Sequence, residues 1–120
     1  MGKYFDLLLR RKSARDQYFA NLDYYLALIK KRANEILQNP KVIIFGSYIK
    51  GKMGPNSDID VMIIAEGLEN TKEDPFKKAK VRMKILEGFD PAHPFELHLV
   101  TPELFENWYK NFIKNDYLEL

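Results

Sequence analysis

The sequence contains no cysteine, which excludes disulfide bonds and thiolate metal sites and is compatible with a reducing cytoplasm. No apolar run approaches the roughly 20 residues of a membrane-spanning helix, so we expect no membrane partner. The N-terminus MGKYFDLLLRRK has a short apolar piece and no small-residue cleavage site, so it is unlike a signal peptide. Repeats, low-complexity tracts and linkers are also lacking. We therefore expect a cytoplasmic protein whose residues 1–120 form a single domain.

The net charge of +2 conceals an uneven distribution along the chain. Residues 1–57 carry 11 Lys and Arg against 4 Asp and Glu, whereas residues 58–120 carry 8 against 13. A basic half beside an acidic half suits a site that holds phosphates and a metal ion, and it suits a charged protein partner equally well. The basic clusters at Arg10–Arg15 and Lys30–Arg32 are expected to be solvated helix faces, with a partner or RNA surface as the alternative.

The N-terminal third of the chain has the apolar spacing of three and four residues that is typical of helices. It predicts a short helix or ordered arm over residues 3–11. A longer helix is expected from a capping box at Ser13 to Leu37, ending before Pro40.

Two further helices are predicted in the second half of the chain. One begins at Asp74-Pro75 and ends at Gly88, and the stripe expected to be buried on it is Phe76, Ala79, Met83 and Leu86. The other is capped by Thr101, and the residues expected on its apolar face are Phe105, Trp108, Tyr109 and Phe112. The tail over residues 116–120 is expected to be frayed.

Three segments are typical of β-strands, namely Lys41–Phe45, Asp58–Ala65 and Phe95–Val100. The second is apolar on both faces after its aspartates, so layers of structure should cover both sides of the sheet. The order of helices and strands predicts an α/β (α+β) fold. Its core is a small mixed sheet of three or more strands flanked by helices.

Asp58 and Asp60 open the second strand, and their spacing places both carboxylates on one face. Adjacent carboxylates repel each other unless a cation lies between them, and a divalent metal that holds a phosphate is the obvious cation. Gly46-Ser47 follows the first strand, where glycine allows close backbone approach to phosphates and serine adds a hydroxyl and an N–H. If the third strand pairs beside the second, Glu96 completes a set of three carboxylates able to hold two divalent ions.

The candidate carboxylates also have plainer interpretations. Asp58 and Asp60 alone would fit a polar strand start or a turn cap, and Glu96 would fit a solvated strand position. Asp90, in the turn before the third strand, is the rival of Glu96 as the third ligand. His98 shares a face with Glu96, but magnesium prefers oxygen ligands, so a metal-bound role is the weaker alternative.

The loop between the first two strands supplies further candidates for nucleotide contacts, namely Ser57, Lys50 and Lys52. Serine in a loop is often only a turn former, and loop lysines are usually solvated. The predicted breakers of this loop are Gly51, Gly54, Pro55 and Asn56. His93, in the segment Pro91-Ala92-His93-Pro94, is expected to be structural or exposed.

Gly46-Ser47 after an apolar strand, residues 48–57, and then Asp58-Ile59-Asp60 opening a hydrophobic strand resemble the signature of the DNA polymerase beta-like nucleotidyltransferase superfamily. The preceding helix and the carboxylate on a later strand also match. The resemblance covers nearly the whole chain and is to the minimal nucleotidyltransferase (MNT) subgroup, which lacks the helical domain of larger members. Members of this subgroup often pair with a helical HEPN protein as antitoxin and toxin.

This resemblance implies roles for the candidate residues. Asp58 and Asp60 would bind two Mg²⁺ ions, with Mn²⁺ as an alternative, that bridge the triphosphate of ATP or another NTP. Glu96 would be the third ligand, near the attacking hydroxyl. Gly46 and Ser47 would hold the β- and γ-phosphates while pyrophosphate leaves.

Three functions follow as hypotheses. The first is metal-dependent transfer of an NMP, AMP from ATP, to a hydroxyl of a HEPN-type partner, as the antitoxin of a HEPN/MNT pair. The second is a non-catalytic or weakly catalytic module that neutralises its partner by occlusion. The third is NMP transfer to a small molecule or an RNA end. The third is disfavoured because no acceptor-binding domain is evident, unless a homo-oligomer or a partner supplies it.

Overall fold

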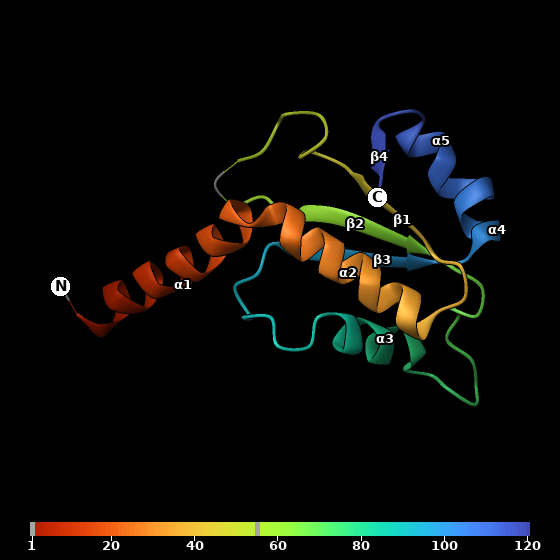
Figure 1. Cartoon of the computed structure of the whole chain (residues 1–120), viewed down its shortest axis with the longest axis horizontal. Helices are drawn as coiled ribbons and strands as arrows, with labels where there is room; N and C mark the ends of the chain where they lie inside the picture. The colour runs from red at the N-terminus through yellow and green to blue at the C-terminus, as the bar shows by residue number, and fades with distance from the viewer. Residues whose placement is uncertain (1, 55) are drawn as a thin grey trace.

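The computed structural model describes residues 2–54 and 56–120, so Pro55, an expected loop breaker, lies outside the described residues. Helix α1 (Lys3–Ala20) is followed by α2 (Leu22–Ile36). Figure 1 shows α1 extending away from the body of the protein, with the N-terminus at its far end. None of the helices within these described ranges is long and apolar enough to cross a membrane.

The first two helices divide differently from the sequence prediction. We expected a break near Ser13, but Ser13 lies inside α1, and the chain breaks at Asn21 instead. Asn21 leaves the helical conformation, with φ −121° and ψ 37°. Its backbone N–H and its side-chain amide both donate to the carbonyl of Gln17, at 3.1 and 3.0 Å. The asparagine side chain therefore competes with the helical ladder and ends α1 inside an otherwise continuous apolar pattern.

The sheet contains four strands in the order β3-β2-β1-β4, namely β1 (Lys41–Phe45), β2 (Ile59–Ile64), β3 (Phe95–Val100) and β4 (Tyr117–Glu119). Strand β1 is antiparallel to β2 and to β4, whereas β2 and β3 are parallel. This arrangement confirms the predicted α/β class with a small mixed sheet. Strand β2 begins one residue later than predicted, so Asp58 precedes it.

Strand β4 corrects the expectation of a frayed tail. Tyr117 pairs with Phe45, and the backbone N–H of Leu120 donates to the carbonyl of Val42 at 2.9 Å. These hydrogen bonds cover the open edge of β1. They depend on the position of the tail beside β1, which the sequence of the tail does not reveal.

The two faces of the sheet have separate apolar cores. One face packs under α1, α2 and α3 (Lys77–Ile85), through buried residues such as Ile29, Ala33 and Ile85. The other face is covered by a C-terminal helical stretch, α4 (Pro102–Leu104), the π-helical η1 (Phe105–Tyr109) and α5 (Lys110–Ile113). Figure 1 shows this stretch lying over the end of the sheet remote from the free end of α1. The predicted cover on both faces is confirmed.

Two helix faces are oriented differently from the prediction. In α3, which begins at Lys77 and not at Pro75, Val81 and Ile85 are buried, whereas Phe76 and Met83 are 68% and 74% exposed. The C-terminal stretch is capped by Thr101 as predicted, because its hydroxyl accepts from the N–H of Leu104 at 3.2 Å.

The expected apolar face of the C-terminal stretch is also only partly buried. Phe105 is buried, but Trp108 and Phe112 are 60% and 69% exposed and stack on each other. The π-helical turn over Phe105–Tyr109 shifts the register of the side chains, so that Ile113 packs on the sheet instead.

Candidate active site

The parallel pairing of β2 and β3 brings Asp60 and Glu96 directly opposite each other. His98, two residues further along β3, lies on the same face. Asp60, Glu96 and His98 each offer one potential metal ligand atom, and these atoms all lie within 4.8 Å of one another. His98 Nε2 lies 3.0 Å from Asp60 Oδ1 and 3.9 Å from Glu96 Oε1. The sheet register therefore assembles an acidic cluster, defined here as Asp60, Glu96 and His98.

The acidic cluster lies at the uncovered end of one sheet face. Further along the same face of β2, Met62 and Ile64 are buried under the C-terminal helical stretch. The ring of Phe45 on β1 contacts His98 edge-on, with the ring centroids 5.1 Å apart. His98 is thus within hydrogen-bond distance of Asp60 and orients that carboxylate, while Phe45 packs against the imidazole.

Gly46 follows β1 and passes directly against Asp60. A Cβ atom at this position would lie 2.3 Å from Asp60 Oδ2, and the residue has φ +80°. Both facts require glycine, because a side chain would collide with the carboxylate and strain the backbone. The glycine leaves Asp60 Oδ2 facing the turn that Gly46 and Ser47 form.

The chain after Gly46 consists of consecutive turns and not of a helix. The N–H of Lys50 donates to the carbonyl of Gly46 at 3.2 Å, and that of Lys52 donates to the carbonyl of Ser47 at 2.9 Å. Ser47 is half-buried, and its hydroxyl lies 3.6 Å from the sulfur of Met53. Lys50 and Lys52 are exposed on this loop.

Ser57 has a clear local role in the same loop. Its hydroxyl accepts from the N–H of Gly54 at 2.8 Å, and its own N–H donates to the carbonyl of Gly54 at 3.2 Å. Its side chain thus closes a turn, which is the plainer of the two interpretations we considered.

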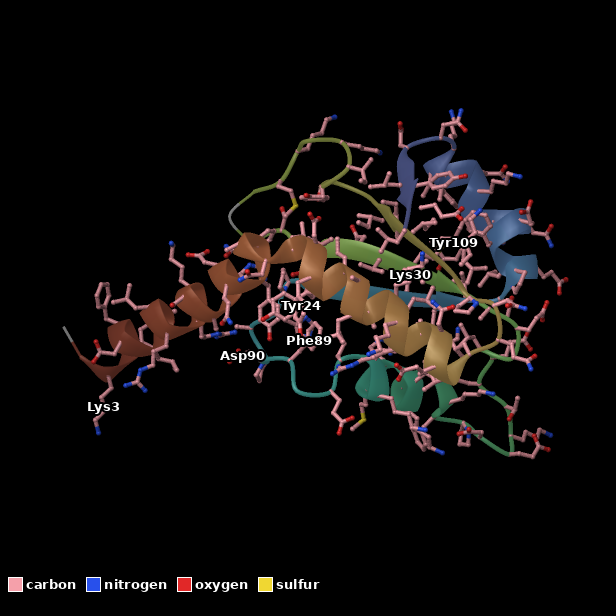
Figure 2. The ribbon with its side chains drawn as sticks, viewed as in Figure 1. Lys3, Tyr24, Lys30, Phe89, Asp90 and Tyr109 are labelled. Atoms are coloured by element: carbon pink, nitrogen blue, oxygen red, sulfur yellow. The ribbon has the colours of Figure 1, made fainter. Side chains whose placement is uncertain are left out.

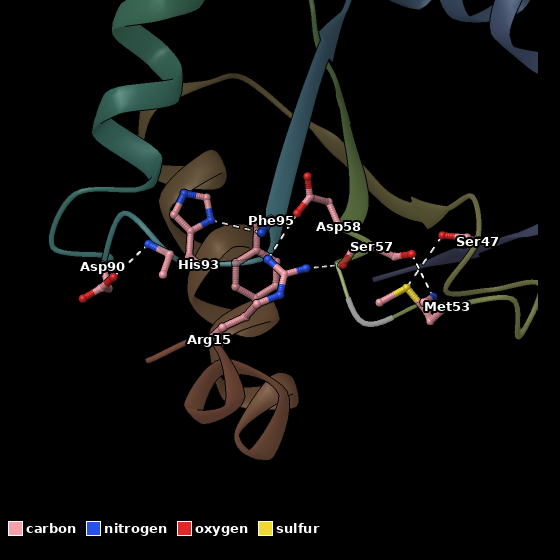
Figure 3. A network of polar contacts seen from close by, with 10 residues as sticks. Arg15, Ser47, Met53, Ser57, Asp58, Asp90, His93 and Phe95 are labelled. Carbon is pink, nitrogen blue, oxygen red and sulfur yellow. Dashed lines mark hydrogen bonds and ion pairs between the residues drawn. The ribbon is translucent and has the colours of Figure 1, made fainter. Parts of the chain in front are cut away.

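Asp58 does not join the acidic cluster in this structure. Its Oδ1 lies 3.4 Å from the guanidinium of Arg15 on α1, and the same guanidinium donates to the carbonyl of Ser57. Figure 3 shows Arg15 reaching up from α1 between Ser57, Asp58 and the turn that carries His93. The structure therefore brings Asp60 and Glu96 together and places Asp58 beside a basic residue that we expected to be solvated.

The turn before β3 contains Asp90 and His93, which sit on the far side of Arg15. Asp90 Oδ1 accepts from the N–H of Ala92 at 2.8 Å, and the N–H of Asp90 donates to the hydroxyl of Tyr18 at 2.6 Å. Figure 2 shows Asp90 and Phe89 near the start of α2, below Tyr24. Asp90 therefore shapes the turn, whereas its rival Glu96 stands beside Asp60.

His93 is structural, as expected. Its Nδ1 accepts from the N–H of Phe95 at 3.0 Å, and its ring stacks on Phe95. Burial lowers the pKa of His93, and Arg15 acts in the same direction, whereas Asp58 and Asp90 oppose the shift. The Nδ1 of His93 thus serves as an acceptor within its own turn.

A cleft of about 750 Å³ separates the middle of α1 from the two loops that lead into β2 and β3. Asp58 lines this cleft, so the cleft reaches the edge of the site. Its polar lining consists of Arg11, Lys12, Arg15, Asp16, Asn56 and His93.

The donor set fits a hard divalent cation. Asp60 and Glu96 present carboxylate oxygens at one point, and Gly46 keeps that point open by having no side chain. Sequence reasoning found both carboxylates but missed Arg15, because no local pattern relates it to Asp58, 43 residues away. It also gave His98 little weight, although the alternation along β3 already placed it on the face of Glu96.

Comparison with known proteins agrees with this geometry. The family model described as "Nucleotidyltransferase domain" matches residues 26–119, which is most of the chain. A crystal structure described as that of a "putative nucleotidyltransferase" from Sulfolobus solfataricus resembles the fold, with a TM-score of 0.55 and 18% sequence identity. The likeness covers 89% of this chain and 85% of that one, and at this identity it speaks for the fold alone. No match was found among curated proteins. The chain therefore belongs to the nucleotidyltransferase domain family, which implies a nucleotide substrate and transfer of a nucleotidyl group.

Proposed function

We propose that the protein is a metal-dependent nucleotidyltransferase that moves AMP from ATP to a hydroxyl of a protein partner. The observation that carries this proposal is the alignment of Asp60 with Glu96 across β2 and β3, with Gly46 packed against Asp60. Such an arrangement places oxygen ligands for Mg²⁺ next to a backbone turn suited to phosphates. Asp60 and Glu96 would hold the metal, and Asp58 would join them once it is free of Arg15. Mn²⁺ is the alternative ion.

In the proposed reaction the acceptor hydroxyl oxygen attacks the α-phosphorus of ATP. The new bond joins that oxygen to the α-phosphorus, and the bond from the α-phosphorus to the bridging oxygen breaks. Pyrophosphate leaves with the electron pair. When bound, divalent ions neutralise triphosphate charge and make the acceptor hydroxyl easier to deprotonate. Glu96, whose side chain is 55% exposed, would be a metal ligand near the attacking hydroxyl, and the hydroxyl proton would pass to water.

The remaining residues of the site bind and orient. Gly46 and Ser47 would supply backbone N–H groups of their turn to the β- and γ-phosphates. Lys50 lies on the exposed loop that follows, and its ammonium would contact the departing pyrophosphate. His98 fixes the direction of Asp60, so that one carboxylate oxygen stays turned toward Gly46. Positioning and charge neutralisation provide most of the catalysis.

The free half of α1 supports a protein acceptor. It extends from the body and carries large apolar side chains that are 40–74% exposed, namely Tyr4, Phe5, Leu7, Leu8 and Leu9. Apolar surface presented in this way is typical of a protein–protein contact. A helical HEPN-type partner, with this protein as the antitoxin of the pair, is the partner we propose for it. A second copy of the chain is the alternative occupant.

The proposal is tested by incubating the protein with ATP labelled at the α-phosphate, Mg²⁺ and the product of the neighbouring gene. We expect label on the partner with the wild type and none with Asp60→Asn. Asp90→Asn is the matched control, because it changes a nearby carboxylate that the structure assigns to a turn.

Two results would contradict the proposal. Complete inhibition of the partner by Asp60→Asn, with no label at any stage, would favour neutralisation by occlusion. Label that appears on RNA ends or on a small molecule, and never on protein, would favour the third hypothesis.

A further inference from the structure

Arg15 connects α1 to the start of β2 by two separate contacts. One guanidinium nitrogen donates to the carbonyl of Ser57, and another lies 3.4 Å from Asp58 Oδ1. The Arg15 side chain is only 20% exposed, and its guanidinium lies 5.7 Å from the centre of the Phe19 ring. Arg15 is thus held in place by contacts that do not involve Asp58.

Asp58, unlike Arg15, is not held in place by other polar contacts of its side chain with the residues that the structure describes. Its side chain is 48% exposed, lies in the loop before β2 and faces the cleft beside α1. Asp60, two residues later, is part of the acidic cluster, whereas Asp58 offers no atom to it. Asp58 therefore lies outside the strand pairing that holds Asp60, and the cation it contacts is Arg15.

We propose that Arg15 is a positioning residue that holds Asp58 out of the metal site and competes with a divalent cation for it. This inference rests on the proposed function, because it assumes that metal binds at Asp60 and Glu96. When a cation occupies the site, Asp58 turns from Arg15 toward it. Arg15 keeps its bond to the carbonyl of Ser57, so α1 need not detach. The exchange replaces one positive neighbour of Asp58 by another.

The family model begins at residue 26, within α2, so Arg15 and the rest of α1 lie outside the residues that it matches. The role proposed for Arg15 therefore rests on its contacts with Ser57 and Asp58 in this structure.

The test is Mn²⁺ binding without nucleotide, followed by the electron paramagnetic resonance of free Mn²⁺. Removal of a competing cation should tighten binding, and because exposed ion pairs are weak, we expect Arg15→Gln to lower the Kd about two- to fivefold. Arg11→Gln is the matched control. It removes the same charge from the same helix and cleft, and we expect it to leave the Kd within about 1.5-fold of wild type. Arg15→Lys should give an intermediate Kd.

The double variant Arg15→Gln/Asp58→Asn identifies the residue through which Arg15 acts. We expect Asp58→Asn to remove the gain that Arg15→Gln produces, because Arg15 acts only through that carboxylate. A loss of folding cannot imitate this result, since damage to the site weakens metal binding and does not tighten it.

Two outcomes overturn the proposal in different ways. Mn²⁺ binding that depends on Asp60 but is equal or weaker in Arg15→Gln, or tightens equally in Arg11→Gln, removes the competition and leaves the proposed function intact. Mn²⁺ binding that is unaffected by Asp60→Asn removes the metal site, and with it both this inference and the proposed chemistry.

Discussion

Asp58 and Asp60 are separated by a single residue, yet their surroundings have little in common. Asp60 is on β2, opposite Glu96, with His98 Nε2 at 3.0 Å and Gly46 packed against its second oxygen. Asp58 precedes the strand and contacts Arg15, which comes from a helix 43 residues earlier. One carboxylate is held by the sheet and the other by a remote side chain.

The Asp58-Ile59-Asp60 segment therefore has one carboxylate fixed by strand pairing and one on the loop that precedes the strand. The register of a parallel pair determines which side chains stand next to each other, and the register of β2 and β3 places Asp60 opposite Glu96. A loop residue has no such constraint, and its direction follows the strongest nearby charge. The two aspartates should therefore respond differently to mutation and to metal.

The largest expected difference is in metal binding by the two aspartates themselves. Asp60→Asn should weaken Mn²⁺ binding without nucleotide by about 100-fold or more, because it removes a ligand that the strands hold in place. Asp58→Asn should change the same Kd by less than about fivefold, because Asp58 must leave Arg15 before it can contribute. Equal losses in the two variants would show that Asp58 already belongs to the site. Far-UV circular dichroism checks that both variants fold.

The second expected effect concerns Gly46, which defines the space next to Asp60. Gly46→Ala introduces a Cβ atom 2.3 Å from Asp60 Oδ2 at φ +80°. We expect nucleotidyl transfer to fall about 100-fold, on the scale of losing one electrostatic contact in a transition state. The control is Gly88→Ala, because Gly88 has φ +82° but nothing within 4 Å of an added Cβ.

Gly88→Ala carries only the backbone strain, about 1–2 kcal/mol in the free energy of unfolding, and should leave transfer unchanged. Urea unfolding measures the stability of both variants. It therefore separates the cost of backbone strain, which both carry, from that of the contact with Asp60, which only Gly46→Ala carries. Equal transfer by Gly46→Ala and wild type would mean that Asp60 moves aside without loss of function.

The parts of the site that the sequence predicted are those that short-range patterns determine. The apolar strands and the Gly46-Ser47 turn depend on neighbours in the chain, and alternation along β3 placed Glu96 on the face of His98. The approach of Glu96 to Asp60 was conditional on the pairing of β3 with β2, and the register confirms it. The sequence therefore predicts that Asp60 and Glu96 lie together, on the condition that β3 pairs beside β2.

The remaining parts depend on contacts between distant segments. The ion pair of Arg15 with Asp58 needs the position of α1 over the sheet, and nothing near Arg15 distinguishes it from the other basic residues of that helix. Strand β4 forms through backbone bonds to β1, and its short segment at the end of the sequence does not reveal that partner. The break at Asn21 was hidden because the apolar spacing continues on both sides of it.

A smaller loss of nucleotidyl transfer is expected for Glu96, on β3, than for Gly46, and almost none for Asp90, in the turn before β3. Glu96→Gln should lower transfer about 10- to 100-fold, because Glu96 stands beside Asp60 and is proposed to hold the metal ion with it. Asp90→Asn should stay within about twofold of wild type, since Asp90 accepts a hydrogen bond within its own turn. Steady-state transfer to the partner measures both. A larger loss in Asp90→Asn than in Glu96→Gln would reverse the assignment of the third carboxylate.

The smallest expected effect is a pH dependence of the free energy of unfolding. It comes from His93, which lies in the turn before β3 near Asp58 and Arg15. Burial lowers the pKa of His93 below its ordinary value of 6.5, so the unfolded chain binds a proton more readily than the folded protein does. The stability that His93 contributes is therefore complete above pH 6.5. It is lost as the pH falls from 6.5 through the lower folded-state pKa.

His93→Gln removes this titration while keeping a side-chain hydrogen-bond acceptor near the N–H of Phe95. We expect the urea midpoint of the wild type to fall more between pH 7 and pH 5 than that of His93→Gln. Far-UV circular dichroism at both pH values checks that His93→Gln folds like the wild type. An equal fall in the two proteins would show that another group titrates over this interval. The burial of His93 beside Asp58 and Arg15 would then not account for the pH dependence of stability.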